Sequence, residues 1–259
     1  MIYIFVFIVF ILFFYLYINY FINSSVNYIS KKEGYFIIDK SNYFKTFTEN
    51  DFKVRNCNSE KHCKTIYKNN LTEFTIPEKK HLAKLVEKTN KLLKPYTSLY
   101  NIPWKFCKIN PDIENGFPHT HDSVIFLSKY FFKRPFANKI ETLIHEKIHL
   151  FQRLYVDKTD ELYKKLGFNK NNTNTQKRRA NPDLDEYNYD YKGNEFYYEY
   201  NENPDNINDV SNFYSKNKEE LVNKFGVEHE HPHEIFAYLI SRKIISKELN
   251  DRDIINYIS

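Results

Sequence analysis

The chain has 259 residues and a net charge of +5, with 38 Lys and Arg against 33 Asp and Glu. This length is enough for one substantial domain with a buried core. Cationic and acidic residues are interspersed along the whole sequence, and no basic stripe marks a nucleic-acid surface. We therefore expect no nucleic-acid partner.

The first segment, residues 1–22, has no charged side chain and consists almost wholly of Ile, Phe, Leu, Val and Tyr. Roughly 20 such residues cross a bilayer core of about 30 Å. The sequence therefore predicts a single-pass membrane protein with an N-terminal transmembrane anchor, in a viral or host membrane. A cleaved signal peptide is the alternative, but it would have a basic start and a shorter apolar run. Lys31 and Lys32 favour a cytoplasmic domain, whereas three N-x-S/T sequons favour the opposite side, so the side stays open.

The segment after the apolar run is polar and aromatic without a clear period. We interpret residues 23–55 as a stalk or linker and residues 56–259 as the folded domain, which the motifs below indicate to be zincin-like and catalytic. Cys57 and Cys63 are close enough in sequence to form a disulfide in an oxidising compartment, which leaves Cys107 odd.

The first half of the domain shows one helix pattern followed by two strand patterns. Thr75 is placed to cap a helix that begins at Pro77 and ends near Pro95. The stretches from Ile102 to Ile109 and from Ser123 to Leu127 are typical of short strands. Together with the helices described below, this predicts an α+β fold.

The strongest signal is the sequence His145-Glu146-Lys147-Ile148-His149, an H-E-x-x-H motif. The surrounding residues 138–155 contain no Gly or Pro, and their apolar residues recur at helical spacing. On a helix, residues four apart lie on the same face, one turn from each other. His145 and His149 can therefore both direct an imidazole nitrogen at one Zn²⁺.

Glu146 has a different predicted role. It flanks the same site and can reach a metal-bound water rather than the metal. A zinc-bound water has its pKa lowered to about 7, and a nearby carboxylate can accept its proton. We therefore expect Glu146 to be the catalytic general base.

After the motif helix, the sequence predicts a short helix ending at Gly167, then a β-hairpin formed by alternating tyrosines around the Lys192-Gly193-Asn194 turn. A further helix begins at Pro232, which suits a first helical turn. Glu234 lies in that turn beside the apolar face, where a carboxylate is costly unless it is paired or binds a metal.

A catalytic zinc site needs three protein ligands and an open position. We predict Glu234 as the third ligand beside His145 and His149. Other residues near the start of the same helix compete for this role, namely Glu228, Glu230, His231 and His233. Two histidines upstream of the motif, His119 and His121, are rivals as ligands, although hydrogen bonds within their loop are the simpler explanation.

With Glu234 as ligand, the arrangement resembles the gluzincin metallopeptidases, in which HExxH is combined with a glutamate from a later helix. Glu234-Ile-Phe-Ala237 fits their loose E-x-x-A pattern, and the resemblance covers about 40 residues of the two helices. The chain also resembles uncharacterised membrane-anchored metallopeptidases predicted in large DNA viruses. The resemblance implies a zincin-like domain, one Zn²⁺ ion, and a strand before the active helix that pairs with substrate. Residues 122–128 are expected to be that strand.

The predicted function is zinc-dependent hydrolysis of peptide bonds in a peptide or protein substrate. The alternative is a membrane or virion structural protein that keeps a zincin fold without turnover. The intact Glu146 argues against this alternative, because metal binding alone does not require that carboxylate.

Overall fold

The computed structural model describes residues 26–171, 178–213, 216, 218–226 and 228–259. Its central element is a five-stranded sheet. The strands β1 (Val26–Tyr28), β3 (Trp104–Ile109), β5 (Val124–Leu127) and β4 (His119–His121) are neighbours in this order. β1, β3 and β5 are parallel, β4 is the antiparallel edge strand beside β5, and β2 (Leu71–Thr72) pairs antiparallel with β3.

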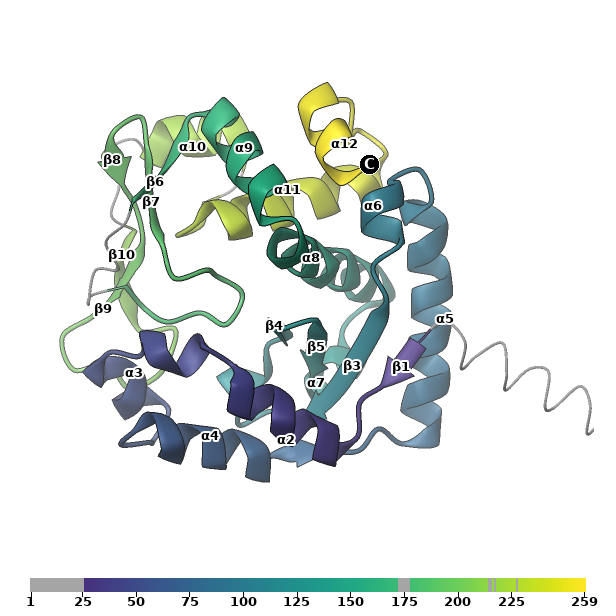
Figure 1. Ribbon diagram of the computed structural model, residues 1–259, viewed down its shortest axis with the longest axis vertical. Coiled ribbons are helices and arrows are strands. Elements are labelled where there is room, and N and C mark those ends of the chain that lie inside the picture. Colours follow the sequence, from purple (N-terminus) through teal and green to yellow (C-terminus); the bar gives the residue numbers. More distant parts are fainter. Residues whose placement is uncertain (1–25, 172–177, 214–215, 217, 227) are drawn as a thin grey trace, which may run out of the picture.

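Helices cover both faces of this sheet (Figure 1). One face packs against α2 (Lys31–Lys40) and α4 (Glu60–Asn69), and the other packs against α5 (Ile76–Leu93) and α8 (Phe136–Leu154). All four residues of β5 are buried, because Ile125 and Leu127 face one core while Val124 and Phe126 face the other. The mixed sheet with separate helices fits the α+β class.

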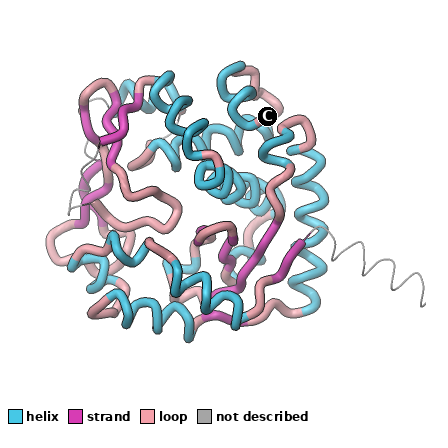
Figure 2. Tube along the Cα trace, viewed as in Figure 1, coloured by secondary structure: helices cyan, strands magenta, loops and turns pink. Residues whose placement is uncertain are grey.

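The remaining elements surround this layered core and include a second, smaller group of strands (Figure 2). The remaining helices are η1 (Tyr43–Thr46), α3 (Glu49–Val54), α6 (Thr97–Tyr100), η2 (Glu114–Gly116), α7 (Lys129–Lys133), α9 (Val156–Leu166), α10 (Lys218–Phe225), α11 (Pro232–Ser246) and α12 (Arg252–Ile258). The strands are β6 (Phe168–Asn171), β7 (Asn188–Tyr191), β8 (Asn194–Glu195), β9 (Tyr198–Tyr200) and β10 (Val210–Phe213).

The helices that the sequence predicted have local causes. Thr75 caps α5 by accepting from the Glu78 amide, and the Glu78 side chain returns the bond, which forms a capping box. α9 ends at Gly167, which adopts the left-handed conformation at φ 100°. α11 begins with Pro232 in its first turn, as its sequence indicated.

The expectation of a single-pass membrane protein with a transmembrane helix is corrected. Among the described residues, no helix is both long enough and apolar enough to cross a bilayer. The two longest helices described, α5 and α8, carry charged side chains along their length, which a bilayer core would exclude. The apolar segment 1–22, on which that expectation depended, lies outside the described residues.

The segment expected to be a stalk is part of the domain. β1 pairs with β3 in the central sheet, and Ile38 of α2 and Phe44 of η1 are buried in the core. The sequence pattern missed this because three strand residues and short helices give too weak a period to recognise. The domain that the structure describes therefore includes residues 26–55.

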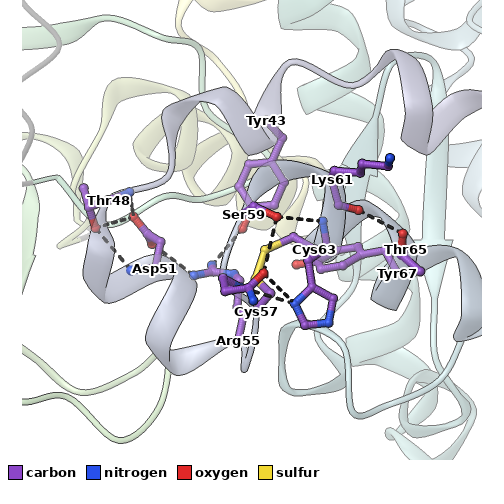
Figure 3. Close-up of a disulfide and its surroundings, with 12 residues drawn as sticks. Tyr43, Thr48, Asp51, Arg55, Cys57, Ser59, Lys61, Cys63, Thr65 and Tyr67 are labelled. Carbon is purple, nitrogen blue, oxygen red and sulfur yellow. Dashed lines mark hydrogen bonds and ion pairs between the residues drawn. A yellow bond between two sulfur atoms is a disulfide. The ribbon is translucent and has the colours of Figure 1, made fainter.

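Cys57 and Cys63 form a disulfide that links the end of α3 to α4, with Cα atoms 5.2 Å apart. Figure 3 shows Asp51 and Arg55 on the adjacent stretch of chain. Cys107 remains a buried free cysteine on β3. The pairing that the spacing allowed is thus the one present.

The expectation that residues 122–128 form the strand that pairs with substrate is corrected. β5, which covers most of residues 122–128, lies between β3 and β4 and has no free edge. The edge is β4, formed by the segment His119–His121, which the sequence indicated only as a loop. Three residues are too few to show a strand period, and only the pairing with β5 reveals the strand.

Candidate metal centre

The HExxH motif lies in the middle of α8, whose 19 residues run from Phe136 to Leu154. Leu143, Ile144 and Ile148 are buried against the sheet and fix the rotation of the helix. This rotation directs His145 and His149 towards α11, and their Nε2 atoms lie 3.0 Å apart. Both imidazoles are buried, with 8% and 0% of their surface exposed.

Glu234 reaches the same point from the first turn of α11. Its Oε2 lies 3.4 Å from His145 Nε2, and its Oε1 lies 3.7 Å from His149 Nε2. The three side chains offer ligand atoms that all lie within 4.8 Å of one another. The structure therefore brings together the three residues that the sequence selected as ligands.

The donor set fits Zn²⁺. Two imidazoles and one carboxylate make up a common catalytic zinc site, and their spacing leaves room for an ion at about 2.0–2.2 Å from each ligand atom. The Glu146 Oε2 atom is buried and has no hydrogen-bond partner among the described residues. An unpartnered carboxylate oxygen beside such a triad suits a metal-bound water.

Gln152 fixes the orientation of His149. Its Nε2 donates to the carbonyl of His233 and to the Tyr163 hydroxyl, both at 3.0 Å. Because the amide nitrogen is committed to these bonds, Oε1 faces His149 Nδ1 at 2.8 Å and accepts its proton. The Nε2 lone pair of His149 then points to the candidate metal position.

His145 lacks an equivalent partner. Its Nδ1 atom is buried without a hydrogen bond in the described part of the chain. Instead, the ring of Tyr238 lies edge-on against it, with centroids 4.3 Å apart. The two histidines are therefore held in different ways, one by a hydrogen bond and the other by packing.

The charged groups of the site act on one another. Burial would raise the pKa of Glu234, but the neighbouring His149 and His145 outweigh it and hold that pKa well below its usual range. Glu146 shows the opposite result, because burial and then the Asp183 and Glu234 carboxylates raise its pKa well above the usual range. The two glutamates thus differ in their readiness to bind a proton.

A cavity of about 500 Å³ opens on one side of the triad. It is lined by His145, Glu146 and Glu234, and also by Tyr238 and His229, whose rings stack at 4.2 Å. Burial raises the pKa of the Tyr238 phenol, so it remains protonated and can donate a hydrogen bond. Sequence reasoning missed this tyrosine, although its position four residues after Glu234 places it on the same helix face.

The rival third ligands have other partners. Glu230 accepts from Arg179 and Asn181, and Glu228 pairs with Lys218. His231 caps α11, since its Nδ1 accepts from the His233 amide at 3.1 Å.

His231, His233 and Asp185 form a second group with metal-ligand spacing. His231 Nε2 lies 3.2 Å from Asp185 Oδ1. Because His231 Nδ1 accepts the amide proton, the neutral ring carries its own proton on Nε2, which faces the Tyr187 carbonyl at 3.3 Å as well as Asp185. This tautomer leaves no lone pair for a metal, so we interpret the second group as structural.

His119 and His121 do not join the triad. Their Nδ1 atoms lie 2.9 Å from the Phe117 carbonyl and 3.1 Å from the Ser41 hydroxyl. His119 thus bonds within its own segment, as expected, whereas His121 bonds to Ser41 at the end of α2, 80 residues earlier in the chain.

Comparisons of the chain with protein-family models, with curated proteins and with solved structures give no match.

Proposed function

We propose that the protein is a zinc-dependent metallopeptidase. The observation that carries this proposal is the convergence of His145, His149 and Glu234 from two helices, with the unpartnered Glu146 carboxylate beside them. A metal site without turnover has no use for a buried carboxylate of this kind. Burial of such a group is destabilising unless a function retains it.

His145, His149 and Glu234 would hold the zinc ion, which when bound supplies Lewis-acid chemistry and lowers the pKa of water. Glu146 accepts the proton of the attacking water and then delivers it to the departing amine. Burial and the neighbouring Asp183 and Glu234 carboxylates raise its pKa, which favours uptake of a proton from the water.

Tyr238 also lines the cavity, beside the metal-site residues. Its protonated hydroxyl is the candidate donor to the carbonyl oxygen as negative charge develops there. Loss of one such donor in other enzymes costs about 10²–10³ in kcat. We therefore expect Tyr238→Phe to lower kcat more than it changes KM.

The test of the proposed function combines metal content with activity. The domain should contain one zinc per chain by elemental analysis and should hydrolyse peptides. Glu146→Gln should keep the zinc but lower kcat/KM by about 10²–10⁴, because the amide cannot accept the water's proton. The matched control is Glu87→Gln on the exposed face of α5, which should change neither quantity. A domain that binds zinc but cleaves nothing in a broad peptide library would instead support the structural-protein alternative.

A further inference from the structure

The loop between residues 178 and 187 enters the centre of the molecule. Figure 1 shows it as a green segment that projects between α8 on one side and β4 on the other. We call its tip, Ala180-Asn181-Pro182-Asp183, the strap. Ala180 and Asp183 are only 4% and 7% exposed, although they belong to a connecting segment.

The strap occupies the edge of β4. The Asp183 Oδ1 atom accepts from the Thr120 amide at 2.7 Å and from the Thr120 hydroxyl at 2.6 Å. Arg153 fastens the same contact, because it donates to the Thr120 hydroxyl and to the Pro182 carbonyl. A side chain of the protein thus takes the place where a partner strand would bind.

This contact leaves β4 unable to pair with a substrate. Amides along an antiparallel strand point alternately towards and away from the neighbouring strand. The Thr120 amide points away from β5, since it bonds to Asp183, so within β4 it is the outward donor. The preceding residue that would share this direction is Pro118, which has no N–H.

The strap also contacts the metal centre. Asn181 Nδ2 donates to Glu234 Oε1 at 3.1 Å and to Glu230 Oε1 at 3.2 Å. It therefore extends from the edge strand on one side to the third ligand on the other. A polypeptide that followed β4 past the metal would have to pass through it.

The positions of two cavities agree with a strap that crosses the path along β4. Asn181 and Pro182 line both the 500 Å³ cavity at the metal and a second cavity of about 780 Å³. His145, Glu146 and Glu234 line only the first, whereas Thr120 and Arg153 line only the second. The strap is thus part of the wall between two hollows that would otherwise form one groove along β4.

The strap is anchored as a fixed wall. The Ala180 amide donates to Asp51 Oδ1, and the Ala180 carbonyl accepts from Arg55 Nη2, both at 3.0 Å. Arg55 is itself buried between Asp51 and Glu114. Figure 3 shows Asp51 and Arg55 beside the Cys57–Cys63 disulfide, which braces this stretch.

We infer that the cleft is closed on the strap side, so that the enzyme acts on short peptides and on chain ends rather than on internal bonds of long polypeptides. This inference depends on the proposed peptidase function. A substrate enters from the open side of the 500 Å³ cavity, and few of its residues fit between the scissile bond and the strap.

The first experiment compares peptides of one central sequence on the zinc-containing wild-type domain. One is a short peptide with free ends, and the other has about twelve residues, about 40 Å when extended, with both ends blocked by acetyl and amide groups. We expect kcat/KM to be at least about tenfold higher for the short peptide, a difference of about 1.4 kcal/mol. Equal cleavage of the blocked long peptide at internal bonds would overturn the inference while leaving the proposed function intact.

The second experiment has a readout other than activity. Calorimetry measures the affinity of the zinc-containing Glu146→Gln protein for two peptide hydroxamates, one short and one extended on both sides. The extended compound should bind at least about tenfold more weakly. Equal or tighter binding of the extended compound would overturn the inference even if no hydrolysis were seen. Absence of zinc from the wild-type domain would instead overturn the proposed function, and the inference with it.

Variants of the strap test whether it causes the preference for short peptides. Asp183→Ala removes the acceptor for Thr120 and should lower the ratio of kcat/KM for the short peptide to kcat/KM for the long one. Asp183→Asn keeps an acceptor oxygen and should preserve that ratio. The ratio is compared within each variant, because Asp183 also acts on the charge of Glu146. The matched control is Asp112→Ala at an exposed turn, which should leave the ratio unchanged. If Asp183→Ala does not fold, the peptide and hydroxamate comparisons on proteins with an unchanged strap still test the inference.

Discussion

Two clusters of histidine and carboxylate meet at the start of α11, and they differ in the use of their ring nitrogens. In the first, His145, His149 and Glu234, the Nε2 atoms face one another at 3.0 Å, and His149 is oriented by Gln152. In the second, His231 Nδ1 accepts a hydrogen bond from the first turn of α11, and its Nε2 faces Asp185. Both clusters satisfy the same spacing. The difference teaches that proximity alone does not make a metal site, because the lone pairs must also be free.

The largest expected effect separates the two clusters by zinc affinity. Glu234→Ala removes a ligand and should lower the affinity by more than the roughly 10–100-fold that loss of an outer-shell partner costs. His231→Ala should leave it almost unchanged. Competition with a chelator measures both variants. Similar losses for the two would show that the second cluster takes part in binding zinc.

An intermediate effect tests the orientation of His149. Gln152→Leu removes the acceptor of the Nδ1 proton while keeping a similar volume, and should lower zinc affinity by about 10–100-fold. Gln152→Glu restores an acceptor and should recover most of the loss. A purely structural role would lower the melting temperature of the Leu variant without changing its zinc affinity, so both quantities should be measured.

A smaller effect concerns the stability that the second cluster provides. Loss of the His231 cap should cost about 1 kcal/mol of unfolding free energy, in the range of other N-caps. Chemical denaturation of His231→Ala and wild type, both stripped of zinc, measures it. The matched control is His62→Ala at an exposed position of α4, where the expected cost is smaller. An unchanged free energy of unfolding for His231→Ala would contradict the structural interpretation.

The last prediction is a pH dependence of the same cluster. Burial would raise the pKa of Asp185, but His233 and His231 outweigh it and hold that pKa below its usual range. A lowered folded-state pKa contributes stability that is present above the unfolded value of about 3.9 and is lost as the pH falls below it. The difference in melting temperature between wild type and Asp185→Asn should therefore be largest near neutral pH and shrink towards about pH 3. A difference that stayed constant would show that the Asp185 charge contributes nothing.

The sequence revealed the parts of the candidate site that depend on local helix geometry. His145, Glu146 and His149 are fixed relative to one another by the 3.6-residue turn, and the apolar stripe of α8 indicates which way they face. Glu234 could be selected because a carboxylate on the buried face of a helix needs a partner. Tyr238 could have been found by the same helix phase.

Other features gave no local signal. The edge strand β4 has three residues, and β1 has three in a segment that looked like a stalk. Asn181 and Asp183 belong to a polar loop without periodicity, so nothing in their neighbourhood indicates that they cross the cleft. Likewise, Gln152 is an ordinary helix residue until His233 and Tyr163 are seen to bind its amide nitrogen.

The sequence by itself therefore determined the candidate ligand pair, the candidate base and the helix that carries Glu234, because these depend on backbone geometry over a few residues. The tertiary structure decided which carboxylate meets the two histidines, which histidine cluster keeps its lone pairs, and where the cleft ends. These depend on how α8, α11, β4 and the strap pack together across long separations in the chain, such as the 89 residues between His145 and Glu234 (234 − 145). Pattern and spacing do not encode such packing, because it is fixed by the burial of whole faces and the pairing of distant polar groups.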